Sequence, residues 1–205
     1  MKFISKYIAK QFKNPVGFGG RFATFMMNRQ NWKQYQSVID NINIQITDKV
    51  FDIGFGNGYL IRKLLKNRPD KIYGIDISSD MVNLVSSKNR EEIKDGKLQL
   101  MLGNVQDIPL ENSSIDKAYT INTVYFWQDI NKGFSEIKRI LKPNGLFLNV
   151  LYLKEFLDKL PMTQFGYSKY TFEQIEKITV ESGLKIENMV EIEHGKSICI
   201  IAKKE

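Results

Sequence analysis

Apolar residues change their spacing within one short stretch of the chain. Residues 50–53 form a mostly apolar run, Gly54, Gly56 and Gly58 follow, and apolar side chains then recur every three or four positions over 60–65. This order predicts a buried strand that passes through a glycine turn into an amphipathic helix. Glycine lets a ligand approach the backbone, and the first turn of a helix presents unpaired N–H groups at its positive end. We therefore expect a nucleotide-like ligand at this turn.

The later part of the chain alternates between strand-like and helix-like patterns. Further strands are predicted at 71–78, at the beginning and at the end of 97–122, at 146–153, and on both sides of the hairpin turn 194–196. Helices are predicted after Ser78 or Ser79, at 129–141 and at 171–183, and a turn at 142–145. These patterns predict an α/β fold with an open sheet of seven strands. The sheet is expected to be mostly parallel, with an antiparallel C-terminal hairpin and helices on both faces.

A helical arm is predicted ahead of this unit. The boundary falls between residues 1–45, which form the arm, and 46–205, which form the sheet-bearing domain. Two amphipathic helical patterns in the arm flank the loop 14–20, which contains Phe18 and three glycines. The arm is a candidate lid, although its Met and Phe residues also fit plain core packing.

Composition limits the class of protein. The 205 residues are 42% hydrophobic and 26% charged, which suits one globular domain with a full core. A single cysteine, Cys199, excludes an intramolecular disulfide, and a single histidine, His194, argues against a His/Cys zinc site, so no metal is predicted. The sequence has no apolar run long enough for a membrane span and no continuous apolar segment near residue 1 typical of a signal peptide. A cytoplasmic location is expected.

The net charge of +7 is concentrated near the start of the chain. Residues 1–50 contain eight Lys or Arg and two Asp, so they account for most of the excess. A basic segment suits RNA, a membrane surface or an anionic substrate. A solvated helix face explains the same charge and is the simpler interpretation.

The spacing of the glycines narrows the ligand. A dinucleotide fingerprint requires G-x-G-x-x-G, but the residue three positions after Gly56 is Tyr59. Asp52 lies two positions before Gly54, where a carboxylate would oppose a pyrophosphate and favour an ammonium group. S-adenosylmethionine (SAM) carries an α-amino group, a carboxylate and a sulfonium, and no phosphate. The pattern Asp52-x-Gly54-x-Gly56-x-Gly58 resembles motif I of class I SAM-dependent methyltransferases, whereas the glycines alone would also fit a turn without a ligand.

An acidic residue follows at the end of the second predicted strand. Asp76 lies 22 positions after Gly54 and can accept hydrogen bonds from both hydroxyls of a ribose. This supports a nucleoside without choosing between NAD and SAM. Ile77 and Met81 are placed to cover an adenine, and both would also serve as ordinary core residues.

Two downstream stretches extend the resemblance. Gly103-Asn104-Val105, followed by 107–110, resembles the family's G-D-A-x-x-L-P-F stretch, with Asn104 in place of the acidic residue. The amide oxygen of Asn104 can still accept from the adenine amino group. Leu141 and 142–145 resemble the family's L-K-P-x-G turn. The resemblance covers about residues 48–203 and is greatest to the methyltransferase type 11, or quinone-biosynthesis, branch, which implies a Rossmann-like sheet.

The resemblance also implies where the methyl group and its acceptor lie. Asn122, at the end of the fourth predicted strand, would lie beside the methyl group of the cofactor. Phe18, Tyr125, Trp127 and Tyr167 are candidates for the acceptor pocket, and core packing is an equal alternative for the last three. No catalytic residue is assigned.

The resemblance implies methyl transfer from SAM to a small-molecule acceptor by direct displacement, with S-adenosylhomocysteine (SAH) as product. Holding the acceptor and the methyl group in line would supply most of the catalysis. An RNA methyltransferase and a non-catalytic SAM-binding protein are the alternatives, although no RNA-binding module is recognisable. The sequence leaves the acceptor, the atom methylated and the oligomeric state open.

Overall fold

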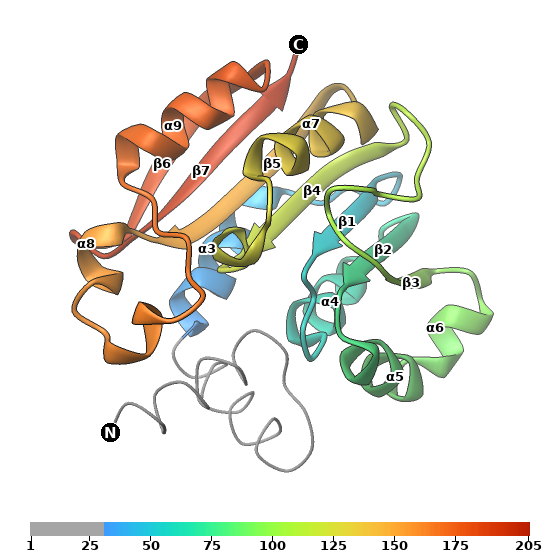
Figure 1. Ribbon diagram of the computed structural model, residues 1–205. Helices are drawn as coiled ribbons and strands as arrows, with labels where there is room; N and C mark the ends of the chain where they lie inside the picture. Colours follow the sequence, from blue (N-terminus) through green and yellow to red (C-terminus); the bar gives the residue numbers. More distant parts are fainter. Residues whose placement is uncertain (1–30) are drawn as a thin grey trace.

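The protein is described by a computed structural model, whose residues 31–205 are placed (Figure 1). The predicted helices before residue 31 lie outside the described residues. Seven strands form one sheet in the order β3-β2-β1-β4-β5-β7-β6. The strands are β1 (Lys49–Ile53), β2 (Lys71–Asp76), β3 (Leu98–Leu102), β4 (Ile115–Ile121), β5 (Leu141–Tyr152), β6 (Leu184–Glu193) and β7 (Ser197–Lys204).

The helices connect and flank these strands. The α-helices are α3 (Trp32–Ile42), α4 (Tyr59–Leu64), α5 (Ser79–Lys88), α6 (Arg90–Lys94), α7 (Ile130–Ile140), α8 (Lys154–Leu157) and α9 (Phe172–Glu181). Short 3₁₀ helices are η1 (Leu65–Asn67), η2 (Val124–Phe126) and η3 (Pro161–Gln164). The strands β1 to β5 pair in parallel, and β7 runs antiparallel to both β5 and β6. The predicted mostly parallel sheet with a C-terminal hairpin is therefore confirmed.

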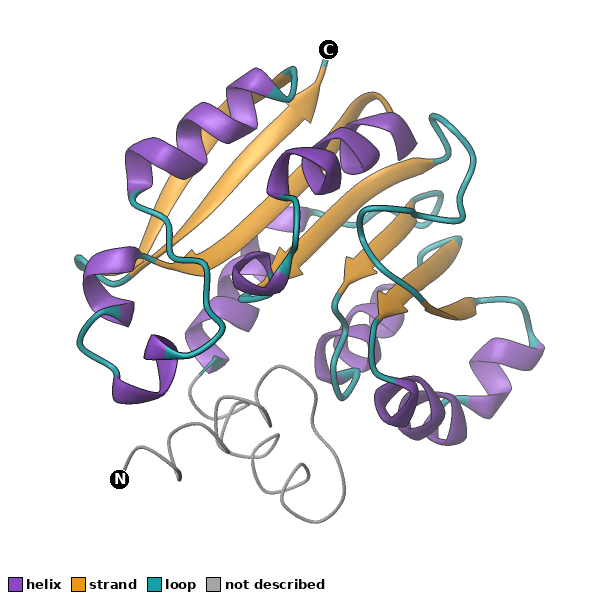
Figure 2. Ribbon diagram, in the orientation of Figure 1, coloured by secondary structure: helices purple, strands orange, loops and turns teal. Residues whose placement is uncertain are grey.

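Helices cover both faces of the sheet, as the sequence predicts (Figures 1 and 2). Two hydrophobic clusters lie between these layers. One cluster contains Phe134 and Ile137 of α7 and Ile175 of α9. The other contains Val38 of α3 and apolar residues of α4 and α5. Because α3 packs on the sheet, the segment on the N-terminal side of the predicted boundary at residue 45 contributes to this second cluster.

The strand order reverses between β1 and β4. The chain runs outward from β1 through β2 to the edge strand β3, then returns to form β4 on the other side of β1. In open parallel sheets, the crevice at the carboxyl ends of the strands beside such a reversal is the usual place for a ligand. The glycine turn directly follows β1 and therefore borders this crevice.

The fifth strand begins earlier than the pattern predicts. The prediction placed a turn at 142–145 and a strand at 146–153, whereas β5 starts at Leu141 and includes the turn as an irregularity in its pairing with β4. Asn144 adopts a positive φ of 65°. A Cβ added to Gly145 would lie 2.9 Å from the carbonyl oxygen of Lys142, so this position requires glycine. The turn at 142–145 is present as predicted. However, β5 pairs with β4 on both sides of it, through Leu141 and Leu146, so the strand includes the turn.

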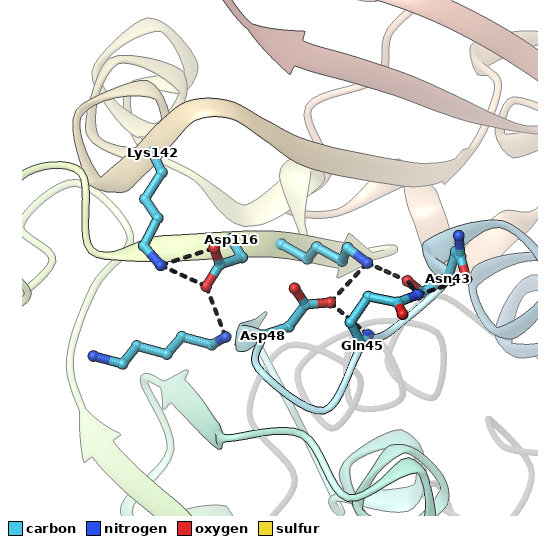
Figure 3. A network of polar contacts seen from close by, with 7 residues as sticks. Asn43, Gln45, Asp48, Asp116 and Lys142 are labelled. Atoms are coloured by element: carbon cyan, nitrogen blue, oxygen red, sulfur yellow. Dashed lines mark hydrogen bonds and ion pairs between the residues drawn. The ribbon is translucent and has the colours of Figure 1, made fainter.

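A polar network holds the amino ends of β1, β4 and β5, opposite the carboxyl-end crevice (Figure 3). The ammonium of Lys117 lies 2.7 Å from the carboxylate of Asp48 and also donates to the carbonyl of Asn43. The carboxylate of Asp116 accepts the backbone N–H of Lys49 at 2.9 Å and lies 2.8 Å from the ammonium of Lys142. This network ties the loop after α3 to the sheet. Among residues 31–205, no helix has the length and apolar character to cross a membrane.

Candidate functional site

A cavity of about 300 Å³ lies at the carboxyl ends of β1, β2 and β4. Twelve of the residues predicted from the sequence line it: Asp52, Gly54, Gly56, Asp76, Ile77, Met81, Asn104, Val105, Asn122, Tyr125, Trp127 and Tyr167. Gly58 is not among the lining residues, and Phe18 lies outside the described part of the chain. Fold topology thus brings together side chains that are up to 115 positions apart in sequence.

The three glycines of the turn differ in what they face. All three have positive φ, at 73° for Gly54, 51° for Gly56 and 67° for Gly58. A Cβ on Gly54 would lie 2.5 Å from the side chain of Thr123, and one on Gly58 would lie 2.7 Å from that of Val85. A Cβ on Gly56 would meet no atom within 4 Å, and this residue lines the cavity. Gly56 is therefore where the backbone is open to a ligand, whereas the other two glycines permit close packing.

Asp52 is a buried carboxylate at the floor of the cavity, only 4% exposed. One of its oxygens accepts a hydrogen bond from the hydroxyl of Tyr119 at 2.7 Å. Burial raises the pKa of Asp52 to about 8, the Tyr119 hydrogen bond opposes this shift, and the charge of Asp76 adds to it. Tyr119 was not predicted as a site residue. Its signal was the parallel register, because Tyr119 on β4 pairs directly with Asp52 on β1.

Asp76 connects the glycine turn to the next helix. One carboxylate oxygen accepts the N–H of Gly56 at 2.8 Å, and the other accepts the N–H of Ser78 at 2.9 Å. Burial raises the pKa of Asp76, and these backbone hydrogen bonds oppose the shift. Each oxygen keeps a further acceptor position that a ligand hydroxyl can use. Ser78 also caps α5, since its hydroxyl accepts the N–H of Met81 at 3.4 Å.

The loop after β3 forms another wall of the cavity. The amide oxygen of Asn104 accepts the N–H of Gln106 at 3.0 Å, which leaves one acceptor position on that oxygen. Val105 and Met81 are 5% and 6% exposed, whereas Ile77 is 51% exposed while lining the cavity. An apolar side chain left open at a cavity wall suits a flat aromatic ligand.

This loop is clamped to α7. The N–H of Ile108 donates to the carboxylate of Glu136 at 3.0 Å. The guanidinium of Arg139 donates to the carbonyls of Ile108 at 2.8 Å and Leu110 at 2.7 Å, and it also pairs with Glu136. That pairing lowers the pKa of Glu136. Sequence reasoning missed this clamp because α7 lies about 30 positions later in the chain.

The other end of the cavity is aromatic. The ring of Tyr167 stacks on that of Tyr125, with centroids 5.6 Å apart, and meets Phe126 edge-on at 4.7 Å. The hydroxyl of Tyr125 donates to Asn122 at 3.0 Å and accepts the backbone N–H of Tyr152. Tyr125 therefore combines the two roles that its sequence left open, because its ring lines the cavity while its hydroxyl is bonded within the core.

Asn122 and Trp127 also use their polar atoms within the protein. The amide nitrogen of Asn122 donates to Asn31 at 3.1 Å, and its backbone has a positive φ of 57°. The indole nitrogen of Trp127 donates to Thr123 at 3.2 Å, and the residue as a whole is 8% exposed. Both residues line the cavity; the single indole N–H of Trp127 is used within the protein, whereas the amide nitrogen of Asn122 has a second N–H.

Further lining residues lay outside the sequence predictions of the site. Tyr35 of α3 lines the cavity, and its ring lies 4.9 Å from that of Tyr59 at an interplanar angle of 33°. The segment after β5, from α8 to η3, adds four lining residues. Three are apolar, Leu157, Leu160 and Met162, and the fourth is Thr163. No helix or strand was predicted for 154–170, so periodicity did not indicate these positions.

The charges of the cavity are one-sided. Among the lining residues that the structure describes, the only carboxylic acids are Asp52 and Asp76, and none is Lys, Arg or His. Within residues 31–205, no group of three or more His, Cys, Asp or Glu is placed to hold a metal ion. Such a site fits a ligand that carries an ammonium and a ribose. It does not suit a pyrophosphate, because no lining residue within 31–205 is a cation.

Several proteins with related sequences or folds are named as methyltransferases. A methyltransferase domain model matches residues 51–149. The chain is 32% identical over 124 residues to the uncharacterized methyltransferase YdaC of Bacillus subtilis, covering 60% of this chain and 66% of YdaC. It is 30% identical over 158 residues to the sterol 24-C-methyltransferase ERG6B of Gibberella zeae, covering 77% of this chain and 39% of ERG6B. The chain thus spans about two thirds of YdaC and less than half of ERG6B.

A solved structure shares the fold. The geranyl diphosphate C-methyltransferase of Streptomyces coelicolor, solved with Mg²⁺, geranyl diphosphate and SAH, matches with a TM-score of 0.75 at 14% identity. The match covers 87% of this chain and 82% of that one. The sheet order and the matching domain identify a class I SAM-dependent methyltransferase. The cofactor is SAM, which leaves as SAH.

Proposed function

We propose that the protein methylates a small-molecule acceptor held at the aromatic end of the cavity. The observation that carries this proposal is the continuity of the cavity, which joins the glycine turn and Asp76 to the rings of Tyr125, Phe126 and Tyr167. ERG6B, a sequence relative, is named for methylation of a sterol. Membership of the quinone-biosynthesis branch stays a prediction from the sequence.

The cofactor end assigns a role to each group by its chemistry. Asp52 would face the α-ammonium, because a buried carboxylate with a raised pKa gains most from a cation. Asp76 would accept the ribose hydroxyls, and Gly56 would let the backbone approach the ligand. Ile77, Met81 and Val105 would enclose the adenine, and the remaining acceptor position of Asn104 would receive its amino group.

Three further residues would shape the backbone around the cofactor without contacting it through their side chains: Gly54, Gly58 and Asn122. Gly54 and Gly58 permit the tight turn, and Asn122 fixes the end of β4 beside it. When bound, SAM supplies a methyl group on a sulfonium, which is a good leaving group. The protein then needs to orient the acceptor and exclude water, and a well-oriented pair can account for roughly 7–11 kcal/mol of barrier reduction.

Tyr125, Trp127 and Tyr167 are proposed to wall the acceptor. The hydroxyl of Tyr125 is engaged by Asn122 and Tyr152, so it orients the pocket and is not proposed as a base. Phe18 remains a candidate acceptor contact from the sequence alone. No general base is assigned, and a proton lost by the acceptor would leave to solvent.

The test separates the cofactor from the acceptor. Calorimetry should show SAH binding and no NAD binding, because the described lining offers two carboxylates and no cation. Incubation of labelled SAM with a mixed metabolite extract should then label small molecules and leave added RNA unlabelled. Labelled RNA would favour the RNA methyltransferase alternative. SAH binding without transfer to any fraction would favour a non-catalytic SAM-binding protein.

A further inference from the structure

We propose that the acceptor is an uncharged, largely apolar molecule with one hydrogen-bonding oxygen, and that Tyr167 binds this oxygen. The inference rests on the proposed function, since it concerns the acceptor end of the same cavity. It adds a chemical class of acceptor and a specificity-determining residue.

The charge of the lining disfavours an anionic acceptor. Asp52 and Asp76 are the only carboxylic acids among the described lining residues, and none of these residues is Lys, Arg or His. An anionic acceptor at the aromatic end would lose its hydration without gaining a described cation as partner, a combination that proteins normally avoid. A phosphate or carboxylate would therefore need a cation that residues 31–205 do not bring to this wall.

The comparison with a diphosphate-binding relative sharpens this point. The geranyl diphosphate C-methyltransferase binds its anionic acceptor in a structure that also holds Mg²⁺. In the described part of this chain, no cluster of acidic, histidine or cysteine side chains could hold such an ion. The described residues at the acceptor end thus offer an anion no ion-binding cluster of this kind.

The wall itself is apolar and aromatic. Tyr125, Phe126 and Tyr167 pack ring against ring. Leu157, Leu160 and Met162 continue the wall beyond them. The backbone N–H of Ser168 donates to the carbonyl of Tyr125 at 2.9 Å, which fixes the segment carrying Tyr167 against η2. Burial of an apolar acceptor against such a surface is favourable, because it removes apolar area from water.

Tyr167 supplies the polar contact. Its ring is held by the two neighbouring rings, and no atom within residues 31–205 hydrogen-bonds its hydroxyl. Burial raises the pKa of Tyr167 to about 12, so the hydroxyl stays protonated and can donate. By contrast, the hydroxyls of Tyr119 and Tyr125 already have protein partners. An acceptor carbonyl, hydroxyl or ether oxygen would complete the hydrogen bonding of Tyr167.

A matched pair of probes tests the class. Binding of 4-propylphenol and of 4-propylphenyl phosphate is measured by calorimetry with the full chain saturated with SAH. We expect the phenol to bind at least tenfold more tightly. Equal or tighter binding of the phosphate ester would overturn the proposal, wherever in the chain its cation came from. Failure of both probes to bind would also overturn it, whereas failure of SAH to bind would contradict the cofactor assignment instead.

Two variants test the residues. Tyr167→Phe keeps the ring stack and removes the hydroxyl, so phenol affinity should fall about fivefold, near 1 kcal/mol for one hydrogen bond, with unchanged SAH affinity. Tyr170→Phe, in the same segment but away from the cavity lining, is the matched control. Met162→Lys should raise phosphate-ester affinity and lower phenol affinity, and Met189→Lys on the exposed strand β6 should change neither. Unchanged phenol affinity in Tyr167→Phe would remove Tyr167 from the proposal.

Discussion

Asp76 acts on both sides of the glycine turn through its two carboxylate oxygens, which accept N–H groups from Gly56 and Ser78. Replacing it by alanine would loosen the turn as well as remove ribose acceptors. Asp76→Asn keeps one acceptor oxygen and is the sharper variant. We expect its SAH dissociation constant to rise about tenfold, since a hydrogen bond to a charged group contributes roughly 1.5–3 kcal/mol.

The control for Asp76→Asn is Asp80→Asn on the exposed side of α5. It removes one negative charge close to the site without touching the cavity lining, so calorimetry should show wild-type SAH affinity. A folded Asp76→Asn protein with unchanged SAH affinity would contradict the ribose assignment.

The buried carboxyl of Asp52 makes stability depend on pH. Its pKa is about 8 in the folded protein against an ordinary value of 3.8, so between about pH 4 and 8 the folded state holds a proton that the unfolded state has released. The free energy of unfolding should therefore fall as pH rises through this range. Asp52→Asn stays neutral and keeps an oxygen for Tyr119, so it should lose this part of the pH dependence.

Urea unfolding of both proteins at several pH values measures the effect without ligand. The difference between wild type and Asp52→Asn should change steadily from pH 4 to 8 and then level off. SAH should bind wild type more tightly as pH rises toward 8, because its ammonium favours the carboxylate. A difference between the two proteins that does not vary with pH would contradict the raised pKa of Asp52.

Residue types were easier to predict from the sequence than their partners. The glycine spacing and Asp52 indicated the ligand class because a turn and its charge are local features. Tyr119 and Thr123 were missed because their partners are distant in sequence. Tyr119 reaches Asp52 across the sheet, and the turn after β4 brings Thr123 against Gly54. Their contacts depend on strand register, which requires the folded sheet.

Among the elements, the loop after β3 depends on α7 for its position. Arg139 and Glu136 together engage the N–H and carbonyl of Ile108 and the carbonyl of Leu110. Arg139→Lys cannot reproduce these several contacts from one ammonium. We expect SAH affinity to fall about fivefold, with little change in kcat once SAM is saturating, because Arg139 positions the loop without lining the cavity.

A milder variant and a surface control accompany this prediction. Glu136→Gln keeps an acceptor for the N–H of Ile108 and should lose less SAH affinity than Arg139→Lys. Lys177→Met removes an exposed cation on α9 and should leave SAH binding unchanged. A fall in kcat at saturating SAM, with unchanged KM for SAM, would argue against a positioning role for Arg139.

Element types followed from local periodicity, whereas some boundaries did not. The 129–141 pattern predicted α7 within one residue at each end, since Asp129 caps it. The bulged start of β5 was misplaced because a Pro-Asn-Gly sequence signals a turn whether or not a neighbouring strand pairs across it. No helix or strand was predicted for 154–170, and these residues hold only the short helices α8 and η3.

At the scale of the whole molecule, the buried ion pair and the cavity lie at opposite ends of the strands. The side chains of Lys117 and Asp48 are each 11% exposed, and their charged groups lie 2.7 Å apart near the amino ends of β4 and β1. Removing one partner leaves a buried charge unpaired, so Lys117→Met or Asp48→Asn should reduce the free energy of unfolding by about 3–5 kcal/mol. SAH affinity of the folded fraction should not change.

Urea unfolding checks this prediction against an exposed pair. Lys177 and Glu181 lie 3.6 Å apart on the surface of α9, and Lys177→Met should change the free energy of unfolding by less than about 1 kcal/mol. Similar losses for the exposed and the buried pair would show that burial of Lys117 does not govern its contribution.

The final prediction concerns the arm before residue 31. Both hydrophobic clusters are built from residues 38–202, and α3 buries Val38 and Ile42 against the sheet. A chain that starts at Asn31 therefore retains the described core and should fold. Asn31 and Tyr35 line the cavity at the beginning of this part.

We propose that this segment closes over the cofactor and walls the acceptor, since a closed lid excludes water and completes a site. Deleting residues 1–30 should then abolish methyl transfer, while circular dichroism and thermal melting show a folded domain and calorimetry still detects SAH. Proteolysis of the full chain within the arm should slow when SAH and an acceptor are both present. Full transfer activity in the truncated protein would show that the described residues alone make the complete site.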